Sequence, residues 1–234
     1  MTVYTKKDIA IHFLMCIVGG FMGAYALIIH AGNYASAQTK NMIDMVISLL
    51  GGNFREFALR VLAVVVYFLG IALYVIVKNK TDLNPQRYAL AVEAAAAVGV
   101  CFIPDFVKPV VAILPIFFMM STQWSAFHGT YGYTSSTIFS TNNLKQASSG
   151  LMEYLCNGER EQLEKAKYFG LTILSFHIGV AAAYFACMLL HRFSAVLCLV
   201  PIGASAYLIR QTSIKYQPQR QEVTKGQFDL KTTP

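Results

Sequence analysis

Ala37-Gln38-Thr39-Lys40-Asn41-Met42 has an echo at Phe139-Ser140-Thr141-Asn142-Asn143-Leu144, and the two Thr-x-Asn motifs begin 102 positions apart, at Thr39 and Thr141. Each stretch follows a long apolar run and ends on an apolar residue. Apolar or small residues then recur at i, i+3, i+4, i+7 and i+8 in both copies, which is the spacing of one helix face. Gly51-Gly52 follows the first copy and Asn157-Gly158 the second, as is typical of helix ends. The sequence therefore predicts two matched short amphipathic helices.

The composition indicates an integral membrane protein. The chain has 234 residues, of which 56% are hydrophobic and 13% are charged, and its mean hydropathy is +0.49. Soluble domains carry about 25% charged residues, so the apolar surface is expected to face membrane lipid. The net charge of +7 does not indicate a nucleic-acid partner, because Lys and Arg stand at the ends of apolar runs, as the positive-inside rule predicts.

Six apolar runs are candidate membrane spans, since a helix needs about 20 apolar residues to cross a bilayer. They are 9–29, 57–77, 88–103, 107–122, 168–190 and 193–209. The third and fourth runs are short, and Pro104 separates them. With six spans, the Lys and Arg clusters that flank the runs fall on one side of the membrane, which predicts that both termini are cytoplasmic.

Three spans in each half imply an inverted repeat, because the first half would begin inside and the second outside. The predicted boundaries are 1–210 for a single all-α transmembrane domain, with repeats at about 9–104 and 105–210, and 211–234 for a mobile cytoplasmic tail. Phe68-Leu69-Gly70-Ile71-Ala72 of the first half resembles His177-Ile178-Gly179-Val180-Ala181 of the second. Inverted repeats with broken helices near the membrane midplane recur among transporters.

Two geometries are open for the short helices. In the re-entrant geometry, the polar stretch before each helix returns into the protein, where non-helical backbone is tolerated if it is buried or lines a cavity. In the interfacial geometry, both helices lie flat on the membrane surfaces. The matched pair favours the first geometry, whereas Lys40 favours the second, since a cation at the midplane is costly. Asp44 stands one turn after Lys40 and is expected to pair with it.

The re-entrant geometry predicts a solute site between the two helix N-termini, because their free N–H groups and positive dipole ends attract polar or anionic ligands. The candidate substrate-binding residues are Thr39, Lys40, Asn41, Gln123, Thr141, Asn142 and Asn143. Glu93 stands alone in an apolar stretch and is either a proton carrier or a partner of Arg87. His128 precedes the second short helix and is either a second proton-coupling candidate or a structural histidine.

Other chemistries have no support in the sequence. The motifs of serine hydrolases, zinc proteases and P-loop proteins do not occur. The five cysteines form no CxxC pair and no metal-like spacing with histidine. We therefore expect no enzymatic activity, no cofactor and no metal site.

The chain resembles the YoaK family of bacterial inner-membrane proteins, which is classed as a domain of unknown function. The resemblance rests on 19–25 and 38–41 in the first half, and on 120–127 and 141–144 in the second. Gly23 stands where the family often has Asp, Lys40 and Asn142 replace two motif glycines, and Trp124-Ser125 replaces an Asn-containing run. The resemblance implies a bacterial plasma-membrane location and does not imply a site that uses the family's aspartate.

Together these patterns favour a small secondary transporter or permease for a small polar or anionic solute. The alternative is a non-transporting membrane scaffold, regulator or lipid-binding protein. The expected partners are membrane lipid and a small-molecule solute, and a homodimer is a candidate assembly.

Overall fold

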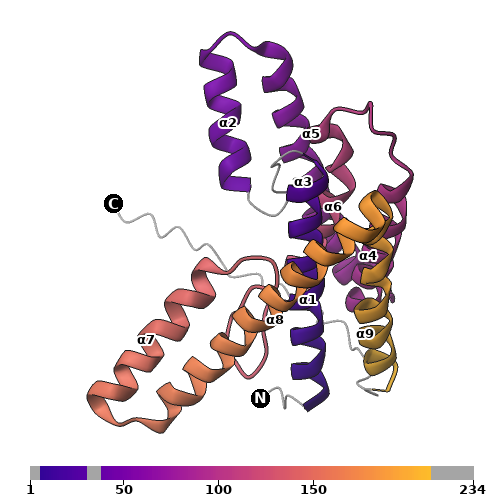
Figure 1. Cartoon of the computed structure of the whole chain (residues 1–234). Coiled ribbons are helices and arrows are strands. Elements are labelled where there is room, and N and C mark those ends of the chain that lie inside the picture. Colours follow the sequence, from indigo (N-terminus) through magenta and orange to yellow (C-terminus); the bar gives the residue numbers. More distant parts are fainter. Residues whose placement is uncertain (1–5, 31–37, 212–234) are drawn as a thin grey trace, which may run out of the picture.

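The computed structural model describes residues 6–30 and 38–211, and every regular element in those ranges is a helix (Figure 1). The elements are α1 (Lys6–Ile29), α2 (Gln38–Leu50), α3 (Phe54–Lys80), α4 (Pro85–Gly99), η1 (Val100–Phe102), α5 (Pro109–Ala112), α6 (Leu114–Ala126), α7 (Thr141–Asn157), α8 (Arg160–Leu190), η2 (His191–Cys198) and α9 (Leu199–Gln211). The predicted all-α class is confirmed over these ranges. The predicted tail beyond Gln211 and the polar stretch before Gln38 lie outside them.

Among the described residues, three stretches are long and apolar enough to cross a membrane. They are Lys6–Ile29, Phe54–Lys80 and the continuous helical run Arg160–Gln211, which contains both of the last two predicted spans. The third and fourth predicted spans correspond to α4 and α6, which have 15 and 13 residues and so fall short of the length a span needs. The structure therefore indicates a helical membrane protein with three clear spanning stretches.

The two short helices form where the repeated motif predicts them. α2 ends at Leu50 and α7 at Asn157, and the glycines that follow have the positive φ expected at a helix end, 72° at Gly52 and 74° at Gly158. Each short helix turns back and packs against the next long helix, α2 on α3 and α7 on α8. Asn53 starts α3, because its side chain accepts a hydrogen bond from the Glu56 N–H at 3.1 Å.

The long helices pair in a crossed arrangement around α1, which stands near the middle of the molecule (Figure 1). α1 packs along α8, and α3 packs along α6. α9 packs against α1, α4 packs against α6, and α4 and α9 also contact each other. The two hairpins, α2–α3 and α7–α8, project at opposite ends of this bundle (Figure 1).

Glycines allow the closest of these crossings. A Cβ atom at Gly20 of α1 would overlap with the Phe176 carbonyl oxygen of α8, and a Cβ atom at Gly179 would overlap with the Ile17 carbonyl oxygen of α1. Gly70 of α3 meets α6 in the same way, close to the Phe118 carbonyl oxygen. Small residues at such contacts let helix backbones approach in lipid, where burial of apolar area offers little driving force.

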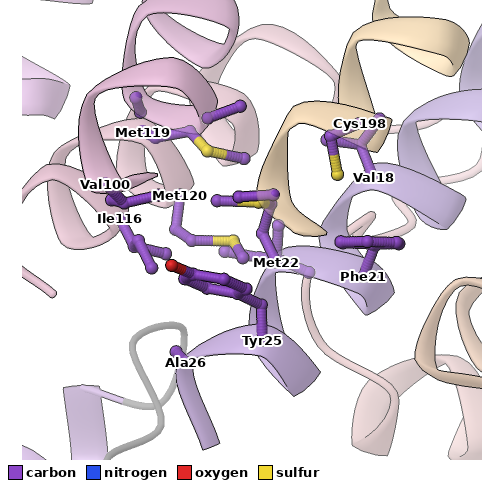
Figure 2. Close-up of a cluster of buried hydrophobic side chains, with 14 of the residues drawn as sticks. Val18, Phe21, Met22, Tyr25, Ala26, Val100, Ile116, Met119, Met120 and Cys198 are labelled. Atoms are coloured by element: carbon purple, nitrogen blue, oxygen red, sulfur yellow. The ribbon is translucent and has the colours of Figure 1, made fainter. Parts of the chain in front are cut away.

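The core lies where α1, α6, η1 and η2 meet. Figure 2 shows Met22 and Tyr25 of α1 facing Ile116 and Met120 of α6. All four side chains are fully buried. Methionine is flexible and polarizable, so it fills the irregular space between crossing helices well.

Because α1 and α8 cross closely, we expect a methyl group added at the crossing to lower the stability of the protein, and one added elsewhere on α8 to leave it unchanged. Gly179→Ala should lower the free energy of unfolding by about 1–3 kcal/mol, because the neighbour it meets is backbone and cannot rotate away. Gly170→Ala in the same helix is the matched control, since nothing lies within 4 Å of its Cβ position. Thermal unfolding in detergent should show a lower midpoint for Gly179→Ala only. Equal midpoints for the two variants would contradict the close crossing.

Candidate functional site

A polar vestibule opens at the end of the bundle where α1 begins and α9 ends. It consists of two adjoining cavities of about 280 and 160 Å³ that share Asp8, Ile11, Gln86, Ala126 and His128. The first cavity also reaches α3 and α9, and the second reaches the buried His12. The vestibule is therefore lined by elements from both halves of the chain.

The loop 127–140 forms one wall of this vestibule and is held by its own backbone. The Ser135 N–H donates to the His128 carbonyl at 3.2 Å, which closes the loop, and the Tyr133 N–H donates to the Thr130 carbonyl at 3.0 Å. The hydroxyl of Tyr168 on α8 accepts the Thr130 N–H at 3.0 Å. The loop is thus fixed on the bundle by defined hydrogen bonds.

His12 is the centre of a buried polar cluster behind the vestibule. Its Nε2 lies 2.9 Å from the Ser135 hydroxyl and 3.3 Å from the Thr172 hydroxyl, and its ring stacks on Tyr168 with centroids 5.5 Å apart. Thr172 donates its hydroxyl proton to the Tyr168 carbonyl, which leaves its oxygen as an acceptor toward His12. The other ring nitrogen, Nδ1, is buried and has no hydrogen-bond partner among the described residues.

Gln123 joins this cluster to the middle of α1. Its Nε2 donates to the Met15 carbonyl at 2.7 Å and to the Thr137 hydroxyl at 3.0 Å, and the side chain is fully buried. Because Met15 belongs to α1 and Thr137 to the loop, Gln123 ties three elements together. The predicted role of Gln123 in substrate binding stays a prediction, since both of its donated bonds go to the protein.

Asn41 and Asn143, the last residues of the two Thr-x-Asn motifs, are buried and bonded to backbone. The Asn143 side chain donates to the carbonyls of Ser136 and Phe139, at 2.7 and 3.0 Å, and accepts the Ser136 N–H at 3.3 Å. The Asn41 side chain donates to the carbonyl of Arg60 on α3 at 3.2 Å. Both asparagines therefore fix the start of a short helix to its surroundings.

The remaining motif residues have exposed side chains. They are Thr39, Lys40, Thr141 and Asn142, and none of the motif residues lines the vestibule. The predicted pair between Lys40 and Asp44 is confirmed, at 2.6 Å. Of the predicted site residues, only His128 lines both vestibule cavities.

Glu93 is fully buried where α4 packs in the bundle. Neither of its carboxylate oxygens has a hydrogen-bond partner among the described residues, so the alternative pairing with Arg87 is not formed. An ionised carboxylate without partners is costly inside a protein, which favours the protonated acid at this position. Glu93 therefore keeps its predicted place as a proton-carrier candidate, at a position separate from the vestibule lining.

The comparison with protein families gives one match. The family described as "Protein of unknown function (DUF1275)" matches residues 11–209, which include both motifs, most of each long helix and all of the vestibule lining except Asp8. The chain belongs to the DUF1275 family. No match was found among curated proteins or among solved structures.

Two polar groups of this DUF1275 protein have partners that its sequence did not predict. His12 lies in the first predicted span, where a buried, hydrogen-bonded histidine is expected, but its partners come from 123 and 160 positions further along the chain. Arg60 lies in the second predicted span and is mostly buried, where it pairs with Glu56 at 2.9 Å and Asp44 at 3.4 Å. A charged residue inside an apolar run was the available signal for Arg60.

Alanine substitutions at the two adjacent asparagines of the second motif should differ sharply in their effect on the stability of this DUF1275 protein. Asn143→Ala should destabilise the protein by about 1–3 kcal/mol, because it leaves buried carbonyls of the loop without a donor. Asn142→Ala is the matched control, since its side chain is exposed. Limited proteolysis of the loop 127–140 and thermal unfolding in detergent should both report the difference. Wild-type behaviour of Asn143→Ala would show that the loop does not depend on this side chain.

Proposed function

We propose that the protein is a small permease for a small polar or anionic solute. The proposal places six crossing segments in two inverted halves, about 9–104 and 105–210, in the bacterial plasma membrane, with both termini cytoplasmic. The observation that carries it is the polar vestibule, which penetrates from one end of the bundle to buried His12. Solute sites of transporters with internal repeats lie at the interface between the repeats.

The pattern of helix packing supports two related halves. If α1 and α6 are equivalent, and α3 and α8 are equivalent, then the α1–α8 crossing corresponds to the α6–α3 crossing. The packing of α9 on α1 corresponds in the same way to that of α4 on α6. Gly70 and Gly179, which fall in the matched segments of the sequence, both stand at these crossings. A duplicated and inverted unit accounts for all three correspondences.

The directions of the short helices support the inverted relation. From their N-terminal ends near mid-height, α2 runs toward one end of the molecule and α7 toward the other (Figure 1). Lys7 Nζ donates to the Gln211 side chain at 3.2 Å, so the start of α1 and the end of α9 lie at the same end. These placements favour the re-entrant geometry, in which both helix N-termini face the midplane.

Within this proposal, the polar residues of the vestibule would receive the solute before it reaches His12. His128 is exposed and lines both cavities, as Asp8 does, so a histidine and a carboxylate stand at the mouth. Glu93 would carry a proton in the core, since its carboxylate is buried and without partners among the described residues.

Thiol labelling tests the inverted geometry. In a cysteine-free background, Leu50→Cys at the tip of the α2–α3 hairpin should react with an impermeant reagent added outside only. Glu159→Cys at the tip of the α7–α8 hairpin should react from inside only. Thr39→Cys and Thr141→Cys should react slowly from both sides, because their positions lie at membrane depth. Fast labelling of both motif positions would favour helices lying on the membrane surfaces.

A solute screen tests transport through the vestibule. Inorganic phosphate, acetate, glycine and urea would be offered to proteoliposomes, and uptake would be followed with radiolabelled solute. At least one should enter faster than in empty liposomes, and His128→Leu should reduce that rate several-fold. His177→Leu is the matched control, since His177 is exposed on α8 and bonded to its own helix. Equal uptake by His128→Leu and His177→Leu would show that His128 does not contribute to the solute path.

A further inference from the structure

A third cavity, which shares no lining residue with the vestibule, lies on the other side of Tyr168 from His12. It has a volume of about 480 Å³ and opens between the first part of α1, the loop 127–140 and the first part of α8. Three aromatic side chains, Phe13, Tyr131 and Tyr133, line it together with Tyr168. Since Tyr168 lines this cavity and stacks on His12, its ring is a wall between this cavity and the His12 cluster.

The aromatic wall is built by an unusual turn. Tyr131 has a φ of 57° and Gly132 a φ of 77°, and the Tyr133 N–H donates to the Thr130 carbonyl at 3.0 Å. A bulky residue rarely adopts a positive φ, and such strained residues gather at functional sites. The turn brings Tyr131 and Tyr133 to the cavity, where the Tyr133 ring lies 5.3 Å from that of Tyr168.

Opposite charges stand beside these rings. Lys167 Nζ lies 2.7 Å from the Glu164 carboxylate, and both side chains are more than half exposed, at 56% and 67%. The cavity therefore offers a cation, a carboxylate and several aromatic faces within one space. Burial is the main cause that raises the pKa of Tyr133, followed by Glu161 and Glu164, so its phenol stays protonated at neutral pH and can donate a hydrogen bond.

The cavity lies where lipid headgroups would be found. Glu164 and Lys167 belong to the charged first turns of α8, directly before the apolar run that starts at Tyr168. Ile9 and Leu171 supply the apolar part of the lining, on the side of α1 and α8 that enters the membrane. Tyrosine is enriched at this boundary between headgroups and acyl chains.

We infer that this cavity binds a phospholipid with a zwitterionic amine headgroup. Lys167 would pair with the phosphate, while Glu164 and the tyrosine faces would receive the ammonium group. The acyl chains would follow Ile9 and Leu171 into the bilayer. An anionic lipid would satisfy Lys167 but would meet Glu164 as a like charge, so the pair of charges selects the zwitterion. This site is independent of the proposed transport activity.

Lipid competition on the full-length chain tests the site. Purified protein in detergent would be titrated with phosphatidylethanolamine or phosphatidylglycerol that carry the same acyl chains, with bound lipid counted by native mass spectrometry. Phosphatidylethanolamine should bind about fivefold more tightly than phosphatidylglycerol, the size expected for one cation–π or ion-pair contact at an exposed site. Glu164→Gln and Tyr133→Leu should each remove most of this preference. Lys165→Gln should keep it, because Lys165 does not line the cavity.

Three results would overturn the inference. Equal binding of the two lipids by the wild-type protein would remove the headgroup selection. A preference that survives in Glu164→Gln would place the lipid elsewhere on the molecule. If soluble O-phosphoethanolamine bound as tightly as phosphatidylethanolamine, the cavity would be assigned to a free solute. Since Glu164 and Lys167 are exposed on α8, the Glu164→Gln variant is expected to fold normally.

Discussion

The close crossing of α1 and α8 is the contact on which the rest of the molecule depends. Gly20 and Gly179 let the two backbones approach until each helix meets a carbonyl of the other. In a bilayer, such approach replaces the hydrophobic driving force that packs soluble helices. α1 also carries α9, borders the vestibule and supplies His12, so its position on α8 determines the positions of all these features.

The need to satisfy polar groups inside the bundle explains how the motif side chains are used. The loop 127–140 brings irregular backbone between helices, and lipid cannot bond to its N–H and carbonyl groups. Asn143 and Tyr168 provide the partners instead, and Gln123 holds the loop through the Thr137 side chain. A buried amide in a membrane protein is therefore as useful for holding a loop as for holding a solute, and the residues left facing open space are those of the vestibule.

Tyr168 is a physical link between the His12 cluster behind the vestibule and the aromatic cavity. Its ring stacks on His12 on one side and lines the aromatic cavity on the other, and its hydroxyl holds the loop between them. The same loop carries His128 at the vestibule and Tyr133 at the aromatic cavity. A displacement of the Tyr168 ring would therefore move atoms both at His12 and at the aromatic cavity. These two sites are connected through packed side chains.

The sequence by itself determined the all-α class and where the two short helices stop. The i, i+3, i+4 spacing after each Thr-x-Asn motif and the glycines that follow predicted α2 and α7, because helix periodicity and helix ends depend on local residues. The Lys40–Asp44 pair was predictable for the same reason, since its members are one turn apart. The tertiary structure alone decided that Asn41 and Asn143 bond to backbone, that Glu93 stays away from Arg87, and that His12 meets Ser135 and Thr172. Those partners are brought together by helix crossings between distant segments, and a local pattern carries no information about which faces will meet.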